Sequence, residues 1–280
     1  MQIVKSVAQM QTICRKLRTQ GVVLGFVPTM GALHQGHLSL VQRATAECQT
    51  VVASIFVNPL QFAPGEDFAK YPRTLEQDAR QLDAEGVAIL FAPDASEMYP
   101  EGAVATITVP GIGDRLDGAS RPGHFTGVAT VVAKLFHIVA PHRAYFGQKD
   151  AAQLAVLRQM IQDLNFDLEL VSCAIVRDAD GLALSSRNQY LSGLEREEAL
   201  VLHQALTRIE HSITIGERQS STLLQIGRNV LDTATGIQVD YLAIVDPRSL
   251  LPVASAEKGA LVAVAAYVGR TRLIDNFLVT

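Results

Sequence analysis

The residues of this sequence best suited to binding or catalysis are two histidines, His34 and His37, which flank Gln35-Gly36. They follow an apolar, strand-like segment, residues 22–27, and lead into a helical pattern over residues 38–44. A helix N-terminus presents unpaired backbone N–H groups and the positive end of the helix dipole, both of which attract anions. Imidazole rings at the same place can donate hydrogen bonds to phosphate oxygens. This spacing favours a site for a nucleoside triphosphate.

Two other interpretations of the histidine pair stay open at this level. The pair could bind a metal ion, or one ring could simply cap the helix. A structural or catalytic metal site needs further ligands, and no cysteine or carboxylate accompanies the pair at the usual spacing. The context of strand, glycine and helix therefore favours phosphate.

A second cluster, Gly147-Gln148-Lys149-Asp150, also lies between a short apolar run and a predicted helix that begins near Ala151. Lys149 could neutralise a phosphate as a point charge, and Asp150 could accept hydrogen bonds from ribose hydroxyls. The alternative is a solvated turn in which Asp150 caps the helix.

Two loops carry further candidate groups. The segment 178–188 contains Ser185, Ser186 and Arg187, whose hydroxyls and permanent cation suit charge that develops on a transferring phosphoryl group. Polar residues in the loop after the second strand-like run lie among apolar ones, a mixture that suits a small polar organic molecule. Both loops could equally be ordinary solvated segments.

The elements that must position these residues follow from hydrophobic patterning. Apolar runs alternate with helical patterns through the first two-thirds of the chain, which predicts a parallel sheet covered by helices on both faces. Two helices and three strands then predict a small α+β domain, with the boundary near 173–177. Residues 1–21 are expected to form a short strand and an amphipathic helix. The further expected strands are 22–27, 51–57, 87–91, 144–146, 168–176, 239–245, 261–268 and 272–279, with an additional apolar run at 104–109; the further expected helices are 37–48, 73–85, 125–139, 151–164, 195–211 and 221–233.

Composition limits the classes of protein to consider. The 280 residues carry a formal net charge of −4 and contain no block of lysine and arginine, so there is no electrostatic case for an extended nucleic-acid surface. Cys14, Cys48 and Cys173 form no CxxC pair and predict no disulfide framework, which fits a reducing compartment. No signal peptide or membrane-spanning stretch is recognisable. We expect a cytoplasmic protein without nucleic-acid or membrane partners.

Five stretches taken together in this order, PTMGALHQGH, FVNPLQF, SRPGHF, FGQKD and GLALSSRN, closely resemble the pantothenate synthetase family, also called pantoate–β-alanine ligases. The His-x-Gly-His element alone indicates only a superfamily of nucleotidyltransferases, which includes class I aminoacyl-tRNA synthetases. The combination is much more specific, and its spacing fits essentially the whole chain.

The resemblance implies a Rossmann-like ATP- and pantoate-binding domain at residues 1–175, a smaller C-terminal lid domain at residues 176–280, and a homodimer. It implies an AMP-forming ligase that uses ATP and Mg²⁺ to condense (R)-pantoate with β-alanine through a pantoyl adenylate, releasing AMP and diphosphate. The alternatives are a nucleotidyltransferase of the same superfamily with another acceptor, or a nucleotide-binding module without catalysis.

The resemblance also transfers residue roles. It makes His37 the expected proton donor and Asp78 the candidate ligand of Mg²⁺, although Gln77 stands where relatives often carry a second acid, which favours an ion held by ATP phosphates and water. The catalytic group comprises His34, His37, Lys149, Ser185 and Arg187. The ATP-binding group comprises Met30, Gly31, Ala32, Leu33, His34, Gln35, Gly36, His37, Gly147, Gln148, Lys149, Asp150, Val176, Leu184, Ser185, Ser186 and Arg187. The pantoate-binding group comprises Asn58, Gln61 and Gln153.

Overall fold

The computed structural model describes residues 1–63 and 66–280. The chain divides into two compact units, which we describe separately. The first unit contains residues 1–113, 121–147 and 156–173, and the second contains residues 114–120, 148–155 and 174–280. The long continuous part of the second unit thus begins at Ala174, while two short segments from earlier in the chain also belong to it. Hydrophobic patterning does not indicate that residues 114–120 and 148–155 belong to the second unit.

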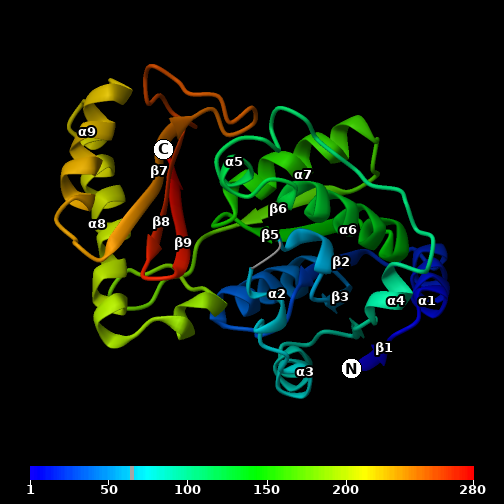
Figure 1. Ribbon diagram of the computed structural model, residues 1–280. Coiled ribbons are helices and arrows are strands. Elements are labelled where there is room, and N and C mark those ends of the chain that lie inside the picture. Colours follow the sequence, from blue (N-terminus) through cyan, green and yellow to red (C-terminus); the bar gives the residue numbers. More distant parts are fainter. Residues whose placement is uncertain (64–65) are drawn as a thin grey trace. The chain divides into compact units, whose positions relative to one another are not determined.

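The first unit is built on a parallel sheet of six strands, as the alternating pattern predicted (Figure 1). Its central strand β2 pairs with β3 on one side and with β5 on the other. Residues 24–27 of β2 are completely buried, which explains why the strand is continuously apolar. In spatial order the strands are β1 (Gln2–Val4), β4 (Ile89–Phe91), β3 (Thr50–Ile55), β2 (Leu24–Thr29), β5 (Arg143–Gly147) and β6 (Glu169–Cys173).

Helices cover both faces of this sheet (Figure 1). On one face, Leu40, Val41 and Ala44 of α2 pack with Leu82 of α3 and with Val27 of β2. On the other face, α6 contacts both β2 and α1. The helices of this part of the chain are α1 (Val7–Thr19), α2 (Gln35–Glu47), η1 (Pro59–Gln61), η2 (Asp67–Ala69), α3 (Leu75–Ala84), α4 (Ala95–Met98), α6 (His124–Val139) and α7 (Ala151–Asp163), whose first residues belong to the second unit.

The order of the strands creates a switch point beside β2. From β2 the chain passes through α2 to β3 on one side, and it later returns to β5 on the other side. In open parallel sheets, ligands bind outside the carboxyl ends of the strands at such a point. The residues that directly follow β2, β3 and β5 therefore lie at the edge where a ligand is expected.

The second unit contains a three-stranded antiparallel sheet in the order β7-β8-β9. Every residue of β8 except Tyr267 is buried, and α8 and α9 pack with this sheet in a single apolar core. Gly269 has a positive φ of 56°, as the tight β8–β9 connection requires. The elements are α5 (Asp117–Ser120), η3 (Ser186–Tyr190), α8 (Gly193–Thr214), α9 (Ser220–Leu231), β7 (Ile237–Val245), β8 (Leu261–Val268) and β9 (Thr271–Leu278).

Secondary structure follows the sequence closely, with one apolar run as the exception. Residues 104–109 form neither helix nor strand, and Val104 is 90% exposed. The Ile107 N–H donates to Thr130 Oγ1 instead of to a neighbouring strand. Apolar character alone therefore did not make this run part of the sheet.

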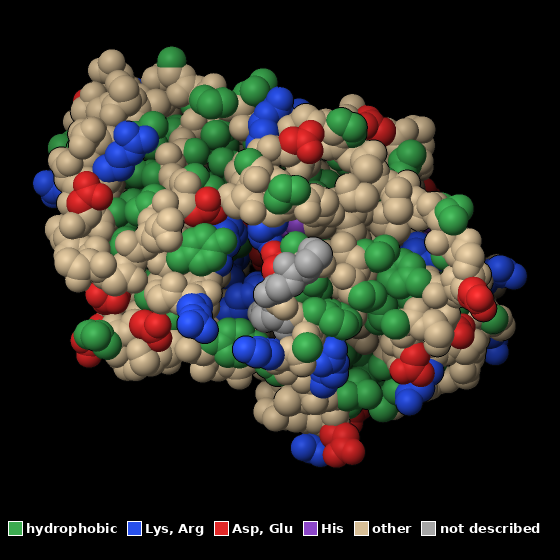
Figure 2. All heavy atoms as spheres, viewed as in Figure 1, with side chains coloured by type: hydrophobic (Ala, Val, Ile, Leu, Met, Phe, Trp, Pro, Cys, Tyr) green, Lys and Arg blue, Asp and Glu red, His purple; other side chains and the backbone are tan. Residues whose placement is uncertain are grey.

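The exposed side chains of the chain carry both signs of charge, in agreement with its formal net charge of −4. On the face shown in Figure 2, both acidic and basic side chains lie among hydrophobic and uncharged ones. Within the described ranges, no helix has the length and apolar character needed to cross a membrane.

Candidate functional site

A tight turn connects β2 to α2 and carries the first half of the histidine motif. Thr29 Oγ1 donates to the Ser54 carbonyl at 2.8 Å and accepts the Gly31 N–H at 3.2 Å. Gly31 has φ +84°, a conformation that a side chain rarely adopts, and a Cβ there would lie 3.0 Å from Asp78 Oδ2. Glycine at this position lets the chain fold back closely against α3.

Asp78 of α3 holds this turn. Its two carboxylate oxygens accept the backbone N–H groups of Ala32 and Leu33, each at 2.9 Å, and Oδ2 also accepts the Thr74 hydroxyl at 3.1 Å. The residue is only 1% exposed. Charge-assisted hydrogen bonds of this kind are about twice as strong as neutral ones, so they fix the backbone of the turn.

The same contacts bear on Mg²⁺. Both Asp78 oxygens are already engaged by the protein. Over the part of the chain that the structure describes, no group of three or more His, Cys, Asp or Glu side chains could hold a metal ion. The residues therefore do not fit a protein-built Mg²⁺ site, and we route no step through such a site.

The two histidines cap α2 reciprocally. His34 is the N-cap residue, and its Nδ1 accepts the Gly36 N–H at 3.1 Å; His37 Nδ1 accepts the His34 N–H at 3.3 Å. The ring centroids are 4.1 Å apart. An imidazole nitrogen that accepts a hydrogen bond carries no proton, so each neutral ring carries its proton on Nε2. The cap thus sets both rings to donate through Nε2.

A polar cluster follows β3 and is centred on Asn58, which is 1% exposed. Asn58 Nδ2 donates to Gln61 Oε1 and to the Gly127 carbonyl, both at 3.1 Å, while Asn58 Oδ1 accepts the Tyr99 hydroxyl at 2.7 Å. Gln61 Nε2 in turn donates to Met30 Sδ at 3.0 Å. Asn58 thereby orients Gln61 and connects the loop after β3 with the turn after β2.

The SRPGHF stretch supports the backbone of the same loop. Arg121 makes two hydrogen bonds to the Glu66 carboxylate, at 2.6 and 2.8 Å, and His124 Nδ1 lies 2.8 Å from the Gln61 carbonyl. Burial raises the pKa of the Glu66 carboxyl, but the hydrogen bond and charge of Arg121, together with the Ala63 N–H and the charge of His124, hold that pKa below its ordinary value. The ion pair therefore forms part of the folded loop.

In the second unit, Lys149 is the candidate phosphate-binding cation. Burial lowers the pKa of its ammonium group, and Arg187 lowers it further, while the carboxylates of Asp150, Asp275 and Asp117 oppose that shift. An ammonium group partly withdrawn from water interacts more strongly with an anion than one on an open surface.

The Ser185–Arg187 motif begins the short helix η3. Ser185 is its N-cap and accepts the Arg187 N–H at 3.3 Å. Just before the motif, the Leu184 N–H donates to the Val176 carbonyl at 3.0 Å, which closes the base of a hairpin. The two residues predicted to lie near ATP are thus backbone partners.

Comparison with known proteins identifies the family. The pattern that defines pantoate-beta-alanine ligases matches residues 2–278. The chain belongs to this family. The chain is accordingly a ligase that joins pantoate to β-alanine and forms pantothenate, as the sequence motifs predicted.

Individual members of the family match over nearly their whole length. The chain is 56% identical to the pantothenate synthetase of Koribacter versatilis, over 99% of this chain and 96% of that protein. Among solved structures, pantothenate synthetase from Thermus thermophilus superposes with a TM-score of 0.95 at 48% identity, covering 100% and 99% of the two chains. The ligase from Francisella tularensis, solved with β-γ ATP and β-alanine, gives 0.82 at 35% identity, covering 99% and 97%.

The residues predicted to bind ATP and pantoate are distributed over both units. The first unit gathers Met30 to His37, Asn58 and Gln61 after the carboxyl ends of β2 and β3, and Gly147 at the carboxyl end of β5. The second unit contains Gln148 to Asp150, Gln153, Val176 and Leu184 to Arg187. Direct contact of these residues with substrate stays a prediction. Four residues support this arrangement although their sequence context assigned them no role: Tyr99, Arg121, His124 and Asn276. Arg121 and His124 belong to the SRPGHF stretch, which marks the family, whereas Tyr99 and Asn276 lie in no such motif.

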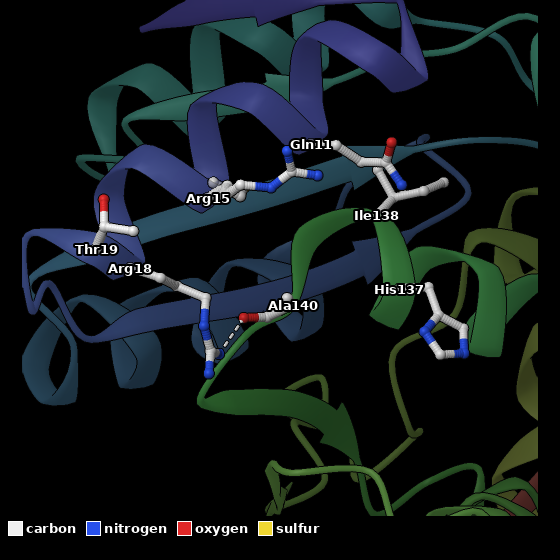
Figure 3. Close-up of a pocket in the computed structure, with 8 residues that line it drawn as sticks. Gln11, Arg15, Arg18, Thr19, His137, Ile138 and Ala140 are labelled. Carbon is white, nitrogen blue, oxygen red and sulfur yellow. Dashed lines mark hydrogen bonds between the residues drawn. The ribbon is translucent and has the colours of Figure 1, made fainter.

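The first unit also contains a cavity whose lining includes none of the predicted site residues. It has a volume of about 390 Å³ and lies between α1 and α6, where Arg18 Nη1 donates to the Ala140 carbonyl at 2.6 Å (Figure 3). Thr19 and Ala140 precede β2 and β5, so the cavity lies near the amino ends of these strands. Its lining residues are Gln11, Cys14, Arg15, Arg18, Thr19, His137, Ile138 and Ala140.

Proposed function

We propose that the chain makes pantothenate in two steps. The carboxylate of pantoate attacks the α-phosphorus of ATP, a P–O bond breaks, and diphosphate leaves with the bonding electrons. The unprotonated amine of β-alanine then attacks the carbonyl carbon of the pantoyl adenylate, the C–O bond to AMP breaks, and AMP leaves with the bonding electrons as the nitrogen loses one proton to water. Activation is necessary because a carboxylate oxygen is a poor leaving group. The Francisella relative solved with β-γ ATP and β-alanine supports this choice of substrates.

The observation that carries the proposal is the reciprocal cap of His34 and His37. It places two imidazoles of defined tautomer at the N-terminus of α2, beside the switch point of the sheet. A helix N-terminus with two Nε2–H donors suits the β- and γ-phosphates, whose charge increases as diphosphate leaves. In this role the neutral ring of His37 donates a hydrogen bond through Nε2–H to the departing oxygen, and no proton transfer is needed for diphosphate to leave.

Charge neutralisation completes the first step. Pantoate and ATP are both anions, so catalysis depends on bringing them together and on offsetting their repulsion. We assign this task to Lys149 and Arg187, with the Ser185 hydroxyl as an additional donor. Losing one such donor typically costs about 10²–10³ in rate.

Pantoate recognition is assigned to Gln61 and Gln153. Asn58 uses both amide hydrogens on Gln61 and Gly127, so we give it the task of orienting Gln61. A fixed amide discriminates between substrates better than a mobile one because less conformational entropy is lost on binding.

Three further features belong to the proposal. Mg²⁺ would be held by the ATP phosphates and water, where it offsets phosphate charge. We also propose that the enzyme works as a cytoplasmic homodimer whose C-terminal domain closes as a lid. Light scattering with size-exclusion chromatography tests the dimer, since a monomer at working concentration would contradict it.

Exchange of labelled diphosphate into ATP tests the proposed chemistry. We expect exchange with pantoate in the absence of β-alanine, and no exchange when pantoate is omitted. Mass spectrometry of a complete reaction should show AMP and pantothenate. A stable product that retains the nucleotidyl group would instead indicate a nucleotidyltransferase with another acceptor.

A further inference from the structure

We infer that Asp275 and Asn276 of β9 are positioning residues for the two segments of the second unit that bind ATP. The inference rests on the proposed function, because that proposal assigns ATP to Lys149 and to Ser185–Arg187. Neither Asp275 nor Asn276 belongs to a motif that marks the family in this sequence. They are nevertheless among the most deeply buried polar residues, at 4% and 2% exposure.

Asn276 holds the lysine turn through its side-chain amide. Nδ2 donates to two consecutive carbonyls, that of Gln148 at 3.1 Å and that of Lys149 at 2.9 Å. Oδ1 accepts the Gln148 Nε2–H at 3.1 Å. Both amide hydrogens and the amide oxygen are therefore used on one dipeptide, so its two peptide planes are fixed together. The direction in which the Lys149 side chain leaves the backbone follows from those planes.

Asp275 holds the other segment through Arg177. The carboxylate and the guanidinium form a bidentate pair, with Oδ2 to Nη1 at 2.6 Å and Oδ1 to Nη2 at 2.9 Å. Arg177 Nη1 also donates to the Gly181 carbonyl at 3.1 Å. Residues 177 and 183 bridge across the hairpin that leads directly into Ser185. The ion pair thus fixes the hairpin from which η3 begins.

The strand explains why two neighbouring residues can reach two different segments. Successive side chains of a strand point to opposite faces. Asp275 shares its face with Leu273 and Phe277, which pack in the apolar core, whereas Asn276 lies on the face of Arg272. Two adjacent positions of β9 therefore set the geometry of the two segments, one from each side of the sheet.

The test uses Asn276→Asp and Asn276→Ala in the full-length enzyme. The aspartate variant keeps the shape of the side chain but sets a carboxylate against the carbonyl oxygens of Gln148 and Lys149. The alanine variant removes all three side-chain hydrogen bonds of Asn276. We expect each to raise the KM and the Kd for ATP about tenfold or more, since misplacing a binding group by 1 Å can cost about 10²-fold. The KM for pantoate should rise less than the KM for ATP, because Gln61 keeps its contact with Asn58 and only Gln153 follows the disturbed turn.

A matched variant separates positioning from general loss of stability. Leu223→Ala opens a cavity in the core of the same unit, on α9. If it raises the Kd for ATP as much as the Asn276 variants do, or if those variants bind ATP like the wild type, the inference is overturned. Should Asn276→Asp not fold, Asn276→Ser and Asp275→Asn provide the same comparison.

The readouts also distinguish this inference from the proposed function. Calorimetry measures ATP binding directly, whereas diphosphate exchange measures activation of pantoate. A wild type that binds ATP without exchange would contradict the proposed chemistry, and the Kd values of the variants would still decide the positioning role. A wild type that binds no ATP would overturn both.

Discussion

The carboxylate of Asp78 accepts the backbone N–H of Leu33 across 45 positions of sequence, at 2.9 Å. The neighbouring Ala32 N–H is held by the other carboxylate oxygen. The turn that leads into the histidine motif is therefore fixed by a side chain of α3, and not by its own sequence alone. Ala32 has φ +51°, so an external anchor compensates for an unfavourable backbone conformation.

We expect Asp78→Asn to loosen this turn. The asparagine keeps one acceptor but turns an N–H₂ group toward a backbone N–H, which leaves a buried donor without a partner. Such a loss costs about 1–3 kcal/mol, which urea unfolding can measure. The KM for ATP should rise with it, about tenfold.

A Mg²⁺ titration at constant ATP separates this role from metal binding. If Asp78 only anchors the turn, Asp78→Asn reaches half-maximal exchange at the wild-type Mg²⁺ concentration. A shift to higher Mg²⁺ would instead make Asp78 a ligand. Thr74→Val, which removes one hydrogen bond to the same carboxylate, should give a smaller effect on the KM for ATP.

His34→Asn separates capping from catalysis. Asparagine is among the best N-cap residues, so its side-chain oxygen replaces Nδ1 as acceptor for the Gly36 N–H. The Nε2–H donor is lost. We expect the free energy of unfolding to stay within about 0.5 kcal/mol of the wild type, while diphosphate exchange falls about 10²-fold. Exchange at the wild-type rate would show that His34 only caps the helix.

The pH dependence of exchange should report Lys149. Burial lowers the pKa of its ammonium group from the ordinary value of 10.5, and only the charged form attracts phosphate. As the pH rises through that lowered pKa, Lys149 loses its proton and the KM for ATP increases. The alkaline limb should therefore begin below the pH at which a free lysine titrates. Diphosphate exchange is the suitable assay because it needs no β-alanine, whose amine also titrates there.

Two substitutions check this assignment. Lys149→Met should reduce exchange about 10²–10³-fold. Lys149→Arg keeps a positive charge at every accessible pH, so the alkaline limb should move upward or vanish. An unchanged limb in Lys149→Arg would assign it to another group.

Gly127→Ala should affect pantoate more than ATP. A Cβ at Gly127 would lie 2.2 Å from the Leu60 carbonyl oxygen and 2.7 Å from the Gln61 nitrogen, so the η1 loop must move. Alanine is otherwise favoured over glycine in a helix by about 1 kcal/mol. We expect a higher KM for pantoate and a nearly unchanged KM for ATP.

Gly193→Ala is the matched control, since nothing lies within 4 Å of a Cβ at that helical position. It should leave both KM values unchanged. If Gly127→Ala behaves in the same way, close packing of η1 against α6 has no part in pantoate binding.

The sequence predicted the fold well where periodicity is governed by burial. The strand 261–268 was placed at its observed bounds, and the buried helix 125–139 differs from α6 by one residue at its start. Both are strongly apolar and have clear ends, Gly123 before the helix and Gly269 after the strand. The exposed run at 104–109 shows the limit, because its apolar residues have no neighbouring strand to pair with.

The residues of the candidate site likewise fall into two groups, those that local motifs reveal and those that only the fold reveals. Local motifs singled out His34 and His37 and raised a cap by one of the two rings only as an alternative. The structure shows that both rings cap α2 reciprocally, which residues three positions apart can do. Local motifs could not identify Asn276 as the partner of Lys149, because the two are 127 positions apart and asparagine in a strand carries no distinctive signal. Asp78 was found by resemblance, but its contacts with the turn required the fold.

The place of Asp275 and Asn276 in β9 has a consequence for biosynthesis. All segments of the first unit, with the histidine pair, precede Ala174 and can leave the ribosome while β9 is still unmade. At about 5–20 residues per second, the nascent chain would spend several seconds or more with its lysine turn and serine–arginine hairpin untethered. The two anchors of the nucleotide segments are thus translated after the whole of the first unit, so a chain that has not yet reached β9 would hold a formed Rossmann-like unit while the lysine turn and the serine–arginine hairpin still lack their anchors.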